Sequence, residues 1–322
     1  MKIGFVGGYG HHYLRAALGP SITAAAASDG RDPDAARRFA NIVGITKWFD
    51  DPIELMDKFQ PDALSIGAIY AMNGPLAAEA LRRDIPTVSD KPIAATWEQL
   101  EKLRKVTSER TRYLLTEFDF RAKPEFRSAR QIVADGSVGQ CVLISAQKSY
   151  RWGTRPKWYA DRASYGGTML WIASHAIDAV QWVSGRQIAR ACGLAGNLSK
   201  SDYGTAEDHL AVLMEMDDGA TAVVHADFLR PAAAASHGDD RLRIAGAKGL
   251  IEVRGERCLL TTATAPEIDM TNLATVRPLH VELLAGLQGQ SEWFSTELSL
   301  ATAKTLLHAR DAADGQKWVE MT

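Results

Sequence analysis

Three short segments of the chain carry groups that could do chemistry together. His175 lies within an otherwise apolar helical segment that a glycine pair opens. Lys91 stands in the tripeptide Asp90-Lys91-Pro92, which ends a strand-like run. Gly7, Gly8 and Gly10 form a cluster directly behind the first apolar run. A base, an ammonium group and a glycine loop suit the dinucleotide-dependent oxidation of an alcohol.

The oxidation of a secondary alcohol needs a base for the hydroxyl proton and a donor for the oxygen. His175 can take the proton, and Lys91 can donate to the oxygen. Each residue also has an ordinary structural explanation, because a lone histidine on an apolar helix is more often a hydrogen-bonded core residue, and a lysine at a strand end is commonly solvated. The prediction that both are catalytic therefore rests on the surrounding pattern.

The glycine cluster predicts a site for the diphosphate of a dinucleotide, because backbone N–H groups can face phosphates where no Cβ intervenes. The match to GxGxxG is partial, since counting from Gly7 puts Tyr9 and His12 at the second and third glycine positions. The alternative is a tight turn that binds no ligand. The loop residues predicted to contact the cofactor are Gly7, Gly8, Tyr9, Gly10 and His11.

Asp29 supports a dinucleotide site, because it follows the second predicted strand about 20 residues beyond Gly7, where a carboxylate can reach the adenosine ribose. Arg31 lies two residues further on and would attract the 2′-phosphate of NADP. The carboxylate repels that phosphate, so NAD is favoured slightly over NADP. Ala68, in a later strand-like run, completes the predicted cofactor contacts together with Lys91.

Up to about residue 118, short apolar runs alternate with helical segments, which predicts a parallel sheet. A capping box of Thr96 and Gln99 predicts where one of these helices begins. The runs that read as buried strands are Ile3 to Val6, Ile22 to Ala27, Ala63 to Ile69 and Pro86 to Ser89.

The second half of the chain has a different pattern, typical of an α+β domain. A helix with Pro124 near its start and Gly136 past its end precedes a strand from Cys141 to Ala146. Glycine turns then separate two pairs of strand-like runs, which predicts antiparallel pairing, and helical spacing returns from about Glu292 to Ala313. We therefore expect two domains, residues 1–118 and residues 119–322.

Composition narrows the classes of function. A net charge of −2 and a pI near 6.5 give no general attraction to nucleic acid or to anionic membranes. The three cysteines lie far apart and form no CxxC pair, which predicts a reducing compartment and no structural metal site. No signal peptide or long apolar stretch is visible, so we expect a cytoplasmic protein without membrane partners.

The motifs together resemble the glucose-fructose oxidoreductase/inositol dehydrogenase/MocA family. Asp90-Lys91-Pro92 is similar to the Glu-Lys-Pro of that family, and the run from Tyr165 to Asp178 is similar to its GGGxLxDxGxHxxD. The segment from His237 to Gly249 resembles its strand–GxKG–strand region. The resemblance extends over essentially the whole chain, and three motifs in the right order are much more specific than any one.

This resemblance implies an α/β protein, with an N-terminal Rossmann domain built on a parallel sheet and a C-terminal α+β domain with a large open, mostly antiparallel sheet. It also implies that Lys91 and His175 are catalytic and that the Lys91–Pro92 peptide can be cis. One position departs from the family, because Trp171 stands where an acidic residue precedes the histidine by one helical turn. An indole cannot accept a hydrogen bond from a sugar hydroxyl, so the substrate contact changes. Asp178 could in principle orient His175, although in the family it looks mainly structural.

A loop between residues 150 and 165 is rich in aromatic and basic side chains, and by analogy with the family it approaches the nicotinamide. Flat rings stack on sugars and guanidinium groups bind carboxylates, so a sugar, polyol or sugar acid is the expected substrate. The alternative is a surface loop whose rings cover the core. Asp119 stands where the family usually has asparagine near the nicotinamide. The predicted substrate-binding residues are Asp119, Arg151, Trp152, Tyr159, Trp171 and His175.

Three functions are consistent with these residues. The leading hypothesis is an NAD(P)-dependent oxidoreductase that moves a hydride between nicotinamide and a secondary alcohol. The second is an NAD-dependent glycosidase or lyase, in which transient oxidation leaves no net redox change. The third is a sugar-sensing protein that binds without chemistry. The open sheet also implies a homodimer or a homotetramer.

Overall fold

The computed structural model describes residues 1–109 and 113–321, which divide into two compact units. The first unit contains the chain up to Glu117 together with residues 163–166 and 277–304. The second contains residues 118–162 and 167–276 and the chain from Thr305 onward. The first break lies next to the boundary predicted after residue 118. The two later segments of the first unit come from far along the chain, where the local pattern gives no sign of this grouping.

The first unit is built on a six-stranded sheet in the order β3-β2-β1-β4-β5-β6. All neighbouring strands are parallel, which confirms the predicted parallel sheet. The order changes direction between β1 and β4, and ligands bind beyond the carboxyl ends of strands at such a point. The strands are β1 (Lys2–Val6), β2 (Thr23–Ala27), β3 (Trp48–Phe49), β4 (Ala63–Ile66), β5 (Thr87–Ser89) and β6 (Leu114–Thr116).

Helices connect these strands, and their caps follow local sequence. Asp32 caps α1 by accepting from Ala35 N, and Gly44 ends the helix in the left-handed conformation. The cap half of the predicted capping box is present, since Gln99 N donates to Thr96 Oγ1 at 3.2 Å, while Oε1 of Gln99 accepts from Ala95 N. The helices are η1 (Tyr13–Ala17), α1 (Pro33–Val43), α2 (Pro52–Glu54), η2 (Leu55–Phe59), α3 (Tyr70–Arg82), α4 (Trp97–Glu109) and α9 (Leu279–Gly286).

The connection after β1 differs from the expected helix. The glycine loop leads into η1, a single short 3-10 helix, and Gly19-Pro20 follow one residue after its end. Leu14 of η1 packs in one core cluster with Leu283 and Leu287 of α9 and its C-terminal end. A distant segment of the chain therefore supplies the apolar cover that a longer helix after β1 would provide.

The second unit is built on a nine-stranded sheet in the order β14-β13-β12-β11-β7-β10-β9-β8-β15. Only the β7–β10 pair is parallel, which confirms a large and mostly antiparallel sheet. The strands are β7 (Cys141–Tyr150), β8 (Ile188–Gly196), β9 (His209–Met216), β10 (Thr221–Asp227), β11 (Gly238–Gly246), β12 (Gly249–Arg254), β13 (Arg257–Thr262), β14 (Ile268–Asp269) and β15 (Val319–Glu320).

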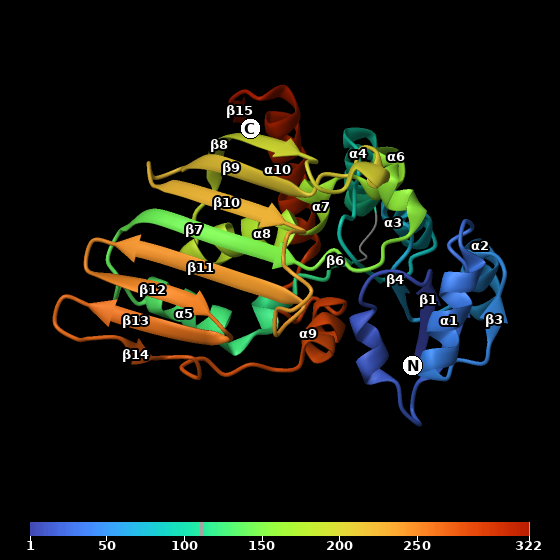
Figure 1. Cartoon of the computed structure of the whole chain (residues 1–322). Helices are drawn as coiled ribbons and strands as arrows, with labels where there is room; N and C mark the ends of the chain where they lie inside the picture. The colour runs from blue at the N-terminus through green and yellow to red at the C-terminus, as the bar shows by residue number, and fades with distance from the viewer. Residues whose placement is uncertain (110–112, 322) are drawn as a thin grey trace. The chain divides into compact units, whose positions relative to one another are not determined.

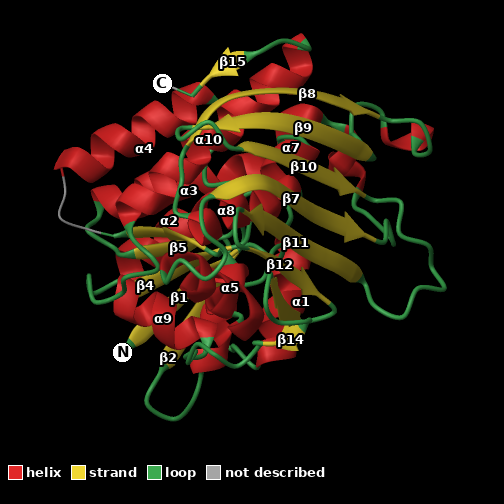
Figure 2. Ribbon diagram, turned by 90° about the vertical axis from the view of Figure 1, so that its left-hand side faces the viewer, coloured by secondary structure: helices red, strands yellow, loops and turns green. Residues whose placement is uncertain are grey.

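Helices cover one face of this sheet, with α8 packed on the central strands β7, β10 and β11 and α5 on β12 and β13 (Figures 1 and 2). Residues of β9 alternate between buried and exposed or half-exposed positions, as expected for a sheet with one face uncovered. The remaining elements are η3 (Asp119–Ala122), α5 (Pro124–Ala134), η4 (Lys157–Ala160), α6 (Arg162–Tyr165), α7 (Thr168–Trp171), α8 (Ala173–Ser184), η5 (Ser201–Tyr203) and α10 (Thr296–Gly315).

A helix that crosses a membrane needs about 20 consecutive and mainly apolar residues. Among residues 1–109 and 113–321, no helix is both long enough and apolar enough to cross a bilayer.

Candidate active site

The glycine loop follows β1 and lies against the carboxyl end of β4. Gly7 has φ +88°, and a Cβ there would lie 2.4 Å from the carbonyl oxygen of Gly67. Tyr9 N donates to the same oxygen at 2.7 Å. Ala68 follows directly, and its Cα would lie 2.7 Å from a Cβ at Gly7. The predicted cofactor residues Gly7 and Ala68 therefore meet at the point where the strand order changes direction, and only glycine fits the first position.

The second and third glycines are equally constrained. A Cβ at Gly8 would lie 2.1 Å from the carbonyl carbon of Ala35, in the first turn of α1. A Cβ at Gly10, where φ is +75°, would lie 2.1 Å from Oδ2 of Asp90. The loop thus packs tightly without side chains, as a turn that brings backbone N–H groups close to a diphosphate requires. Because none of the three positions has room for a Cβ, Gly7, Gly8 and Gly10 fit a dinucleotide-binding loop.

His12 occupies the third glycine position of the motif counted from Gly7. Its backbone has φ 45° and ψ 53°, the left-handed conformation that glycine adopts most readily. The side chain is buried, its Nδ1 lies 2.8 Å from Oγ of Ser65, and its ring stacks on Phe39. Burial lowers the pKa of His12 to about 4. A neutral imidazole therefore fills the space beneath the loop.

Asp29 follows β2 by two residues, as predicted, but its carboxylate already accepts hydrogen bonds from the protein backbone. It accepts from the backbone N–H groups of Arg31, Asp32 and Ile69 at 2.8–2.9 Å, and the residue is 1% exposed. Asp29 thus holds the turn before α1 against the start of α3. Arg31 itself is exposed. Contacts of either residue with a ribose or a 2′-phosphate stay predictions.

Tyr9 points from the glycine loop to the turn before α1. Its hydroxyl donates to Oδ2 of Asp32 at 2.5 Å. Burial raises the pKa of Asp32. The hydrogen bonds that its carboxylate accepts from Tyr9 and from Ala35 N lower the pKa by more, so the net shift is downward. The loop and the α1 cap are therefore tied together by an ionised carboxylate.

Lys91 follows β5 and is buried, with 1% exposure. Its Nζ lies 3.6 Å from Oδ1 of Asp90, and the Lys91–Pro92 peptide is cis. Burial raises the pKa of Asp90, but the charges of Lys91 and His11 outweigh this and hold it well below its ordinary value. The ion pair explains how an ammonium group is kept in an interior where an isolated charge would be costly.

Asp90 also joins this lysine to the glycine loop. Its Oδ2 accepts from His11 N at 3.0 Å, and Nδ1 of His11 lies 3.3 Å from the same oxygen. Buried Asn73 adds a second link, because its Oδ1 accepts from Ala68 N while its Nδ2 donates to the carbonyl oxygen of Asp90. The predicted residues His11, Ala68 and Lys91 are therefore part of one hydrogen-bonded structure.

Glu117 belongs to the same cluster, and the sequence reasoning missed it. It directly follows β6, is fully buried, and accepts from Tyr13 N at 3.0 Å through Oε1. Burial and the neighbouring charge of Asp90 raise the pKa of Glu117 well above its ordinary value. The sequence did hold a signal for Glu117. Its carboxyl group directly follows a buried apolar run, just as Asp90 directly follows β5.

His11, Asp90 and Glu117 each offer a ligand atom, and these atoms lie within 4.8 Å of one another. Such a trio has the donor types of a metal site. The ammonium of Lys91 already balances the charge of Asp90, however, so we assign the trio to the lysine and to the glycine loop rather than to an ion.

The second unit holds the predicted base. His175 is in the first turn of α8, is 2% exposed, and packs against the rings of Phe118 and Phe120. Its Nδ1 lies 3.1 Å from Oδ1 of Asp119. Asp178 instead forms an ion pair with Arg121, which agrees with the structural role expected for it.

Asp119 is the nearest carboxylate recorded for His175. Burial raises the pKa of Asp119, but the charges of His175, Lys123 and Lys148 lower it by more, so it lies well below its ordinary value. The sequence indicated Asp119 only as a substrate contact. Its position beside His175 depends on η3 folding against α8, which no local pattern predicts.

Trp171 ends α7 and is 6% exposed. Ile172 separates α7 from α8, so the glycine-opened segment forms two short helices rather than the single helix expected. The division is slight, because Ile172 keeps right-handed helical angles (φ −85°, ψ −39°) and Oγ of Ser174 donates to the carbonyl oxygen of Trp171 across it. The role of Trp171 in substrate binding stays a prediction.

The aromatic and basic loop packs on its own unit. The ring of Trp152 lies 4.6 Å from that of Tyr203 and 5.0 Å from that of Phe228, measured between centroids. Tyr159 is 2% exposed, so its ring covers the core. Arg151 N donates to the carbonyl oxygen of His237 at 3.0 Å. These contacts favour a structural part for the rings, while substrate binding by Arg151, Trp152 and Tyr159 stays a prediction.

Comparison with known proteins agrees with this geometry. Residues 1–118 match the oxidoreductase family with an NAD-binding Rossmann fold, and residues 126–252 match the GFO/IDH/MocA C-terminal domain. A solved structure of a Thermotoga maritima protein is 32% identical, covers 99% of this chain and 100% of its own, and superposes with a TM-score of 0.93. The predicted family, the oxidoreductase class and the NAD cofactor are thereby confirmed.

More distant relatives match a smaller share of the sequence or share the fold alone. The rhizopine catabolism protein MocA of Rhizobium meliloti is 24% identical over 69% of this chain and 70% of its own. An inositol dehydrogenase homologue of Azotobacter vinelandii, solved with NAD+, is 18% identical, covers 99% of this chain and 97% of its own, and has a TM-score of 0.83. The matched regions span from 46% to 70% of the curated relatives' length. The chain belongs to the GFO/IDH/MocA oxidoreductase family.

Proposed function

We propose that this oxidoreductase transfers a hydride between nicotinamide and a secondary alcohol of a sugar, polyol or sugar acid. The observation that carries the proposal is the buried ammonium of Lys91, which Asp90 links to the glycine loop. A buried lysine is costly unless it is paired, so its presence beside a nucleotide loop indicates a functional site. Relatives named scyllo-inositol 2-dehydrogenase (NAD(+)) and D-glucoside 3-dehydrogenase support the substrate class.

The residues divide the work of alcohol oxidation between them. NAD, when bound, accepts the hydride. Lys91 donates a hydrogen bond to the substrate oxygen and stabilises the negative charge that develops as its proton leaves. His175 takes that proton when the alcohol is oxidised and returns it in the reverse direction. Burial and the charge of Asp90 raise the pKa of Glu117, which disfavours a second negative charge beside Lys91.

Two other functions remain as competing proposals, because Trp171 replaces the acidic residue of the family pattern. Without an acidic residue at that position, the acid–base set could serve an elimination with transient oxidation, as in an NAD-dependent glycosidase or lyase. A protein that only senses sugars is the third proposal. The contact between Asp119 and His175 favours a working base, because it places a carboxylate beside the imidazole although position 171 has none.

A panel assay distinguishes these proposals. Purified protein is tested with polyols, sugars and sugar acids in the presence of NAD or NADP, and nicotinamide absorbance is followed. Steady reduction of the nucleotide with one class of alcohol supports the dehydrogenase. Many turnovers of a glycoside without net reduction favour the glycosidase, whereas tight binding without hydride transfer favours the sensing protein.

We also propose that the chain assembles as a homodimer or homotetramer through the uncovered face of the nine-stranded sheet. Leu143, Leu194 and Leu213 are exposed on β7, β8 and β9, beside a largely apolar depression of about 330 Å³ lined in part by Cys192 and Val223. Light scattering after gel filtration should give a multimer for the wild type and a smaller species for Leu213→Glu. Leu198→Glu, at a 90% exposed position outside the strands, is the matched control.

The cytoplasm is the proposed location. The three cysteines, Cys141, Cys192 and Cys258, are free thiols, which suits a reducing compartment.

A further inference from the structure

We infer that Asp119 is the positioning carboxylate of His175, and that it takes the part that the family pattern gives to an acidic residue at position 171. Oδ1 of Asp119 lies 3.1 Å from Nδ1 of His175. The inference rests on the proposed function, because it treats His175 as the base. It goes beyond that function by naming the group that orients the imidazole and stabilises its charged form.

The other candidates for this part are occupied or unsuitable. Asp178, on the same helix as His175, accepts from Arg121 Nε at 3.0 Å and forms an ion pair with that guanidinium. Trp171 has an indole in place of a carboxylate and can only donate. Asp119 comes from η3, outside the helical motif, so its carboxylate reaches the histidine from another element.

A row of alternating charges keeps Asp119 ionised. Its Oδ2 lies 3.3 Å from Nζ of Lys123, and that ammonium lies 3.5 Å from Oδ2 of Asp240. The other oxygen of Asp240 lies 2.8 Å from Nζ of Lys148, which is 2% exposed and lies over the ring of Phe120. Each charge in the row has an opposite neighbour, as buried and half-buried ions require.

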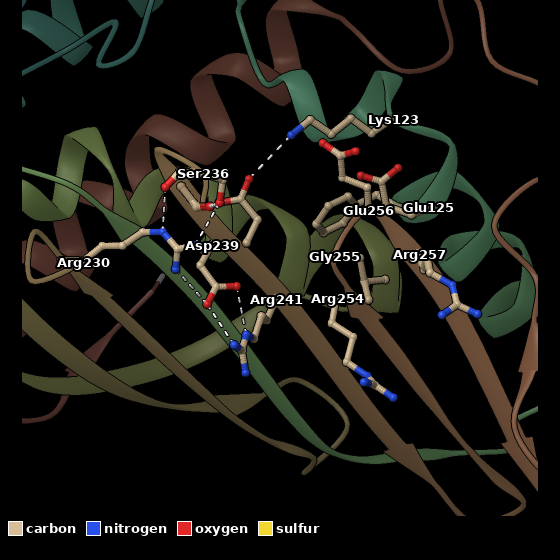
Figure 3. A pocket seen from close by; sticks show the side chains of 14 residues that line it. Lys123, Glu125, Arg230, Ser236, Asp239, Arg241, Arg254, Gly255, Glu256 and Arg257 are labelled. Atoms are coloured by element: carbon tan, nitrogen blue, oxygen red, sulfur yellow. Dashed lines mark hydrogen bonds and ion pairs between the residues drawn. The ribbon is translucent and has the colours of Figure 1, made fainter. Parts of the chain in front are cut away.

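The row ends at a polar pocket of about 840 Å³, which Lys123 and Asp240 line together with Arg230, Asp239 and Glu256 (Figure 3). Exposure of the side chain rises from 2% at His175 to 18% at Asp119 and 35% at Lys123. The groups next to Nδ1 of the imidazole therefore extend outward toward solvent.

This arrangement assigns the two ring nitrogens. Asp119 favours a proton on Nδ1, because a carboxylate attracts a donor and repels a lone pair. Nε2 is then the nitrogen that takes the substrate's hydroxyl proton, and Asp119 stabilises the imidazolium that results. The other charged groups on η3, α8 and β7 are Arg121, Asp178 and Lys148. The elements α5, β10 and β11, which also pack on α8, and the residue before α5 carry Lys123, Glu125, Arg127, Arg130, Asp227, Asp239, Asp240, Arg241 and Arg243.

The first test needs no substrate. The titration of His175 is followed by NMR in protein with labelled histidine, and its signal among the eight histidines is assigned with His175→Gln. Asp119→Asn should lower the midpoint of His175 by about one pH unit or more, since an opposite charge at this distance favours the imidazolium. Lys123→Gln should raise the midpoint by a smaller amount, because it removes a cation near the carboxylate.

The controls separate this effect from damage to the fold. Asp217→Asn removes the same charge from the exposed turn between β9 and β10, beside Gln187, and should leave the midpoint unchanged. A folded Asp119→Asn protein with the wild-type midpoint would overturn the inference. If Asp119→Asn does not fold, an unchanged midpoint in Lys123→Gln would overturn it instead.

The second test uses an alcohol that the panel assay identifies. Asp119→Asn should lower kcat about 10²-fold, the scale of general-base catalysis, with the affinity for NAD unchanged. Its activity should persist to lower pH than in the wild type, and Asp119→Glu should restore part of kcat. A shift in the NMR midpoint without turnover of any alcohol would count against the proposed function while supporting the role of Asp119.

Discussion

The imidazole of His12 stacks on the ring of Phe39, with centroids 4.4 Å apart, from a backbone that lies in the left-handed region. The sequence motif has glycine at this position. The histidine keeps the glycine conformation and adds a side chain that reaches Oγ of Ser65 beneath the loop. Burial of the uncharged ring therefore couples the stability of the cofactor loop to pH.

His12→Asn should remove part of the acid sensitivity of the protein. The pKa of His12 falls from 6.5 to about 4 on folding, so its contribution is complete above pH 6.5 and is lost as the pH falls toward 4. At about pH 5 the wild type should have lost about 2 kcal/mol relative to about pH 7.5 through this group. Asparagine tolerates the left-handed backbone but does not titrate there. Urea unfolding at both pH values measures how the free energy of unfolding depends on pH. The control His225→Gln, at an exposed strand position, should show the same pH dependence as the wild type.

Glu117 should give a pH dependence of stability opposite in sign to that of His12, and Glu117→Gln should remove it. Burial and Asp90 raise the pKa of Glu117 in the folded protein, so the folded state keeps a proton that the unfolded state loses above about pH 4.5. Wild-type stability therefore falls as the pH rises from that point, by about 1.4 kcal/mol for each pH unit up to the folded pKa. Glutamine cannot ionise and should gain relative to the wild type between pH 4.5 and neutrality. If the wild type and Glu117→Gln differ in stability by the same amount at pH 4.5 and at neutral pH, folding does not raise the pKa of Glu117.

Gly8→Ala should weaken both the fold of the first unit and NAD binding. The new Cβ would lie 2.1 Å from the backbone of Ala35, so the loop or α1 must move, at a cost of about 1–3 kcal/mol. Gly19→Ala is the matched control, because nothing lies within 4 Å of a Cβ at that position. Thermal unfolding and nucleotide fluorescence would show the difference. Wild-type affinity in Gly8→Ala would exclude a close approach of this loop to the diphosphate.

Lys91→Met should abolish turnover while NAD binding, followed by nicotinamide fluorescence, survives. Methionine fills a similar volume but cannot donate to the substrate oxygen, so the stabilisation of the developing charge is lost. Lys105→Met, on an exposed position of α4, should behave as the wild type. Unchanged turnover in Lys91→Met would remove this lysine from the mechanism.

Local patterns were sufficient for the elements that position the predicted residues. Alternating apolar runs indicated β1, β2, β4 and β5, and the glycine cluster marked the turn after β1. The capping box located the start of α4. These features depend on residues close together in the sequence, where propensity and capping act directly.

The features that were not predicted depend on contacts between distant segments. Glu117 becomes important only because β6 lies beside β5, which places its carboxyl group near Asp90. Asp119 meets His175 only once η3 packs against α8. The short η1 is explained by α9, whose residues are more than 250 positions away in the sequence. A single sequence shows none of these pairings.

The return of the chain to the first unit limits how this protein can be divided. Leu114 N donates to Oγ1 of Thr296 and Thr116 N to Oγ of Ser299, so the outermost strand β6 depends on the start of α10. A fragment that ends at residue 118 would keep β5 beside that strand but lose its partners in α10, and the apolar surface beneath α9 would be uncovered. Neither half should therefore survive as a separate fragment, and a nucleotide-binding piece would have to be engineered by joining residues 277–304 back to the first 117.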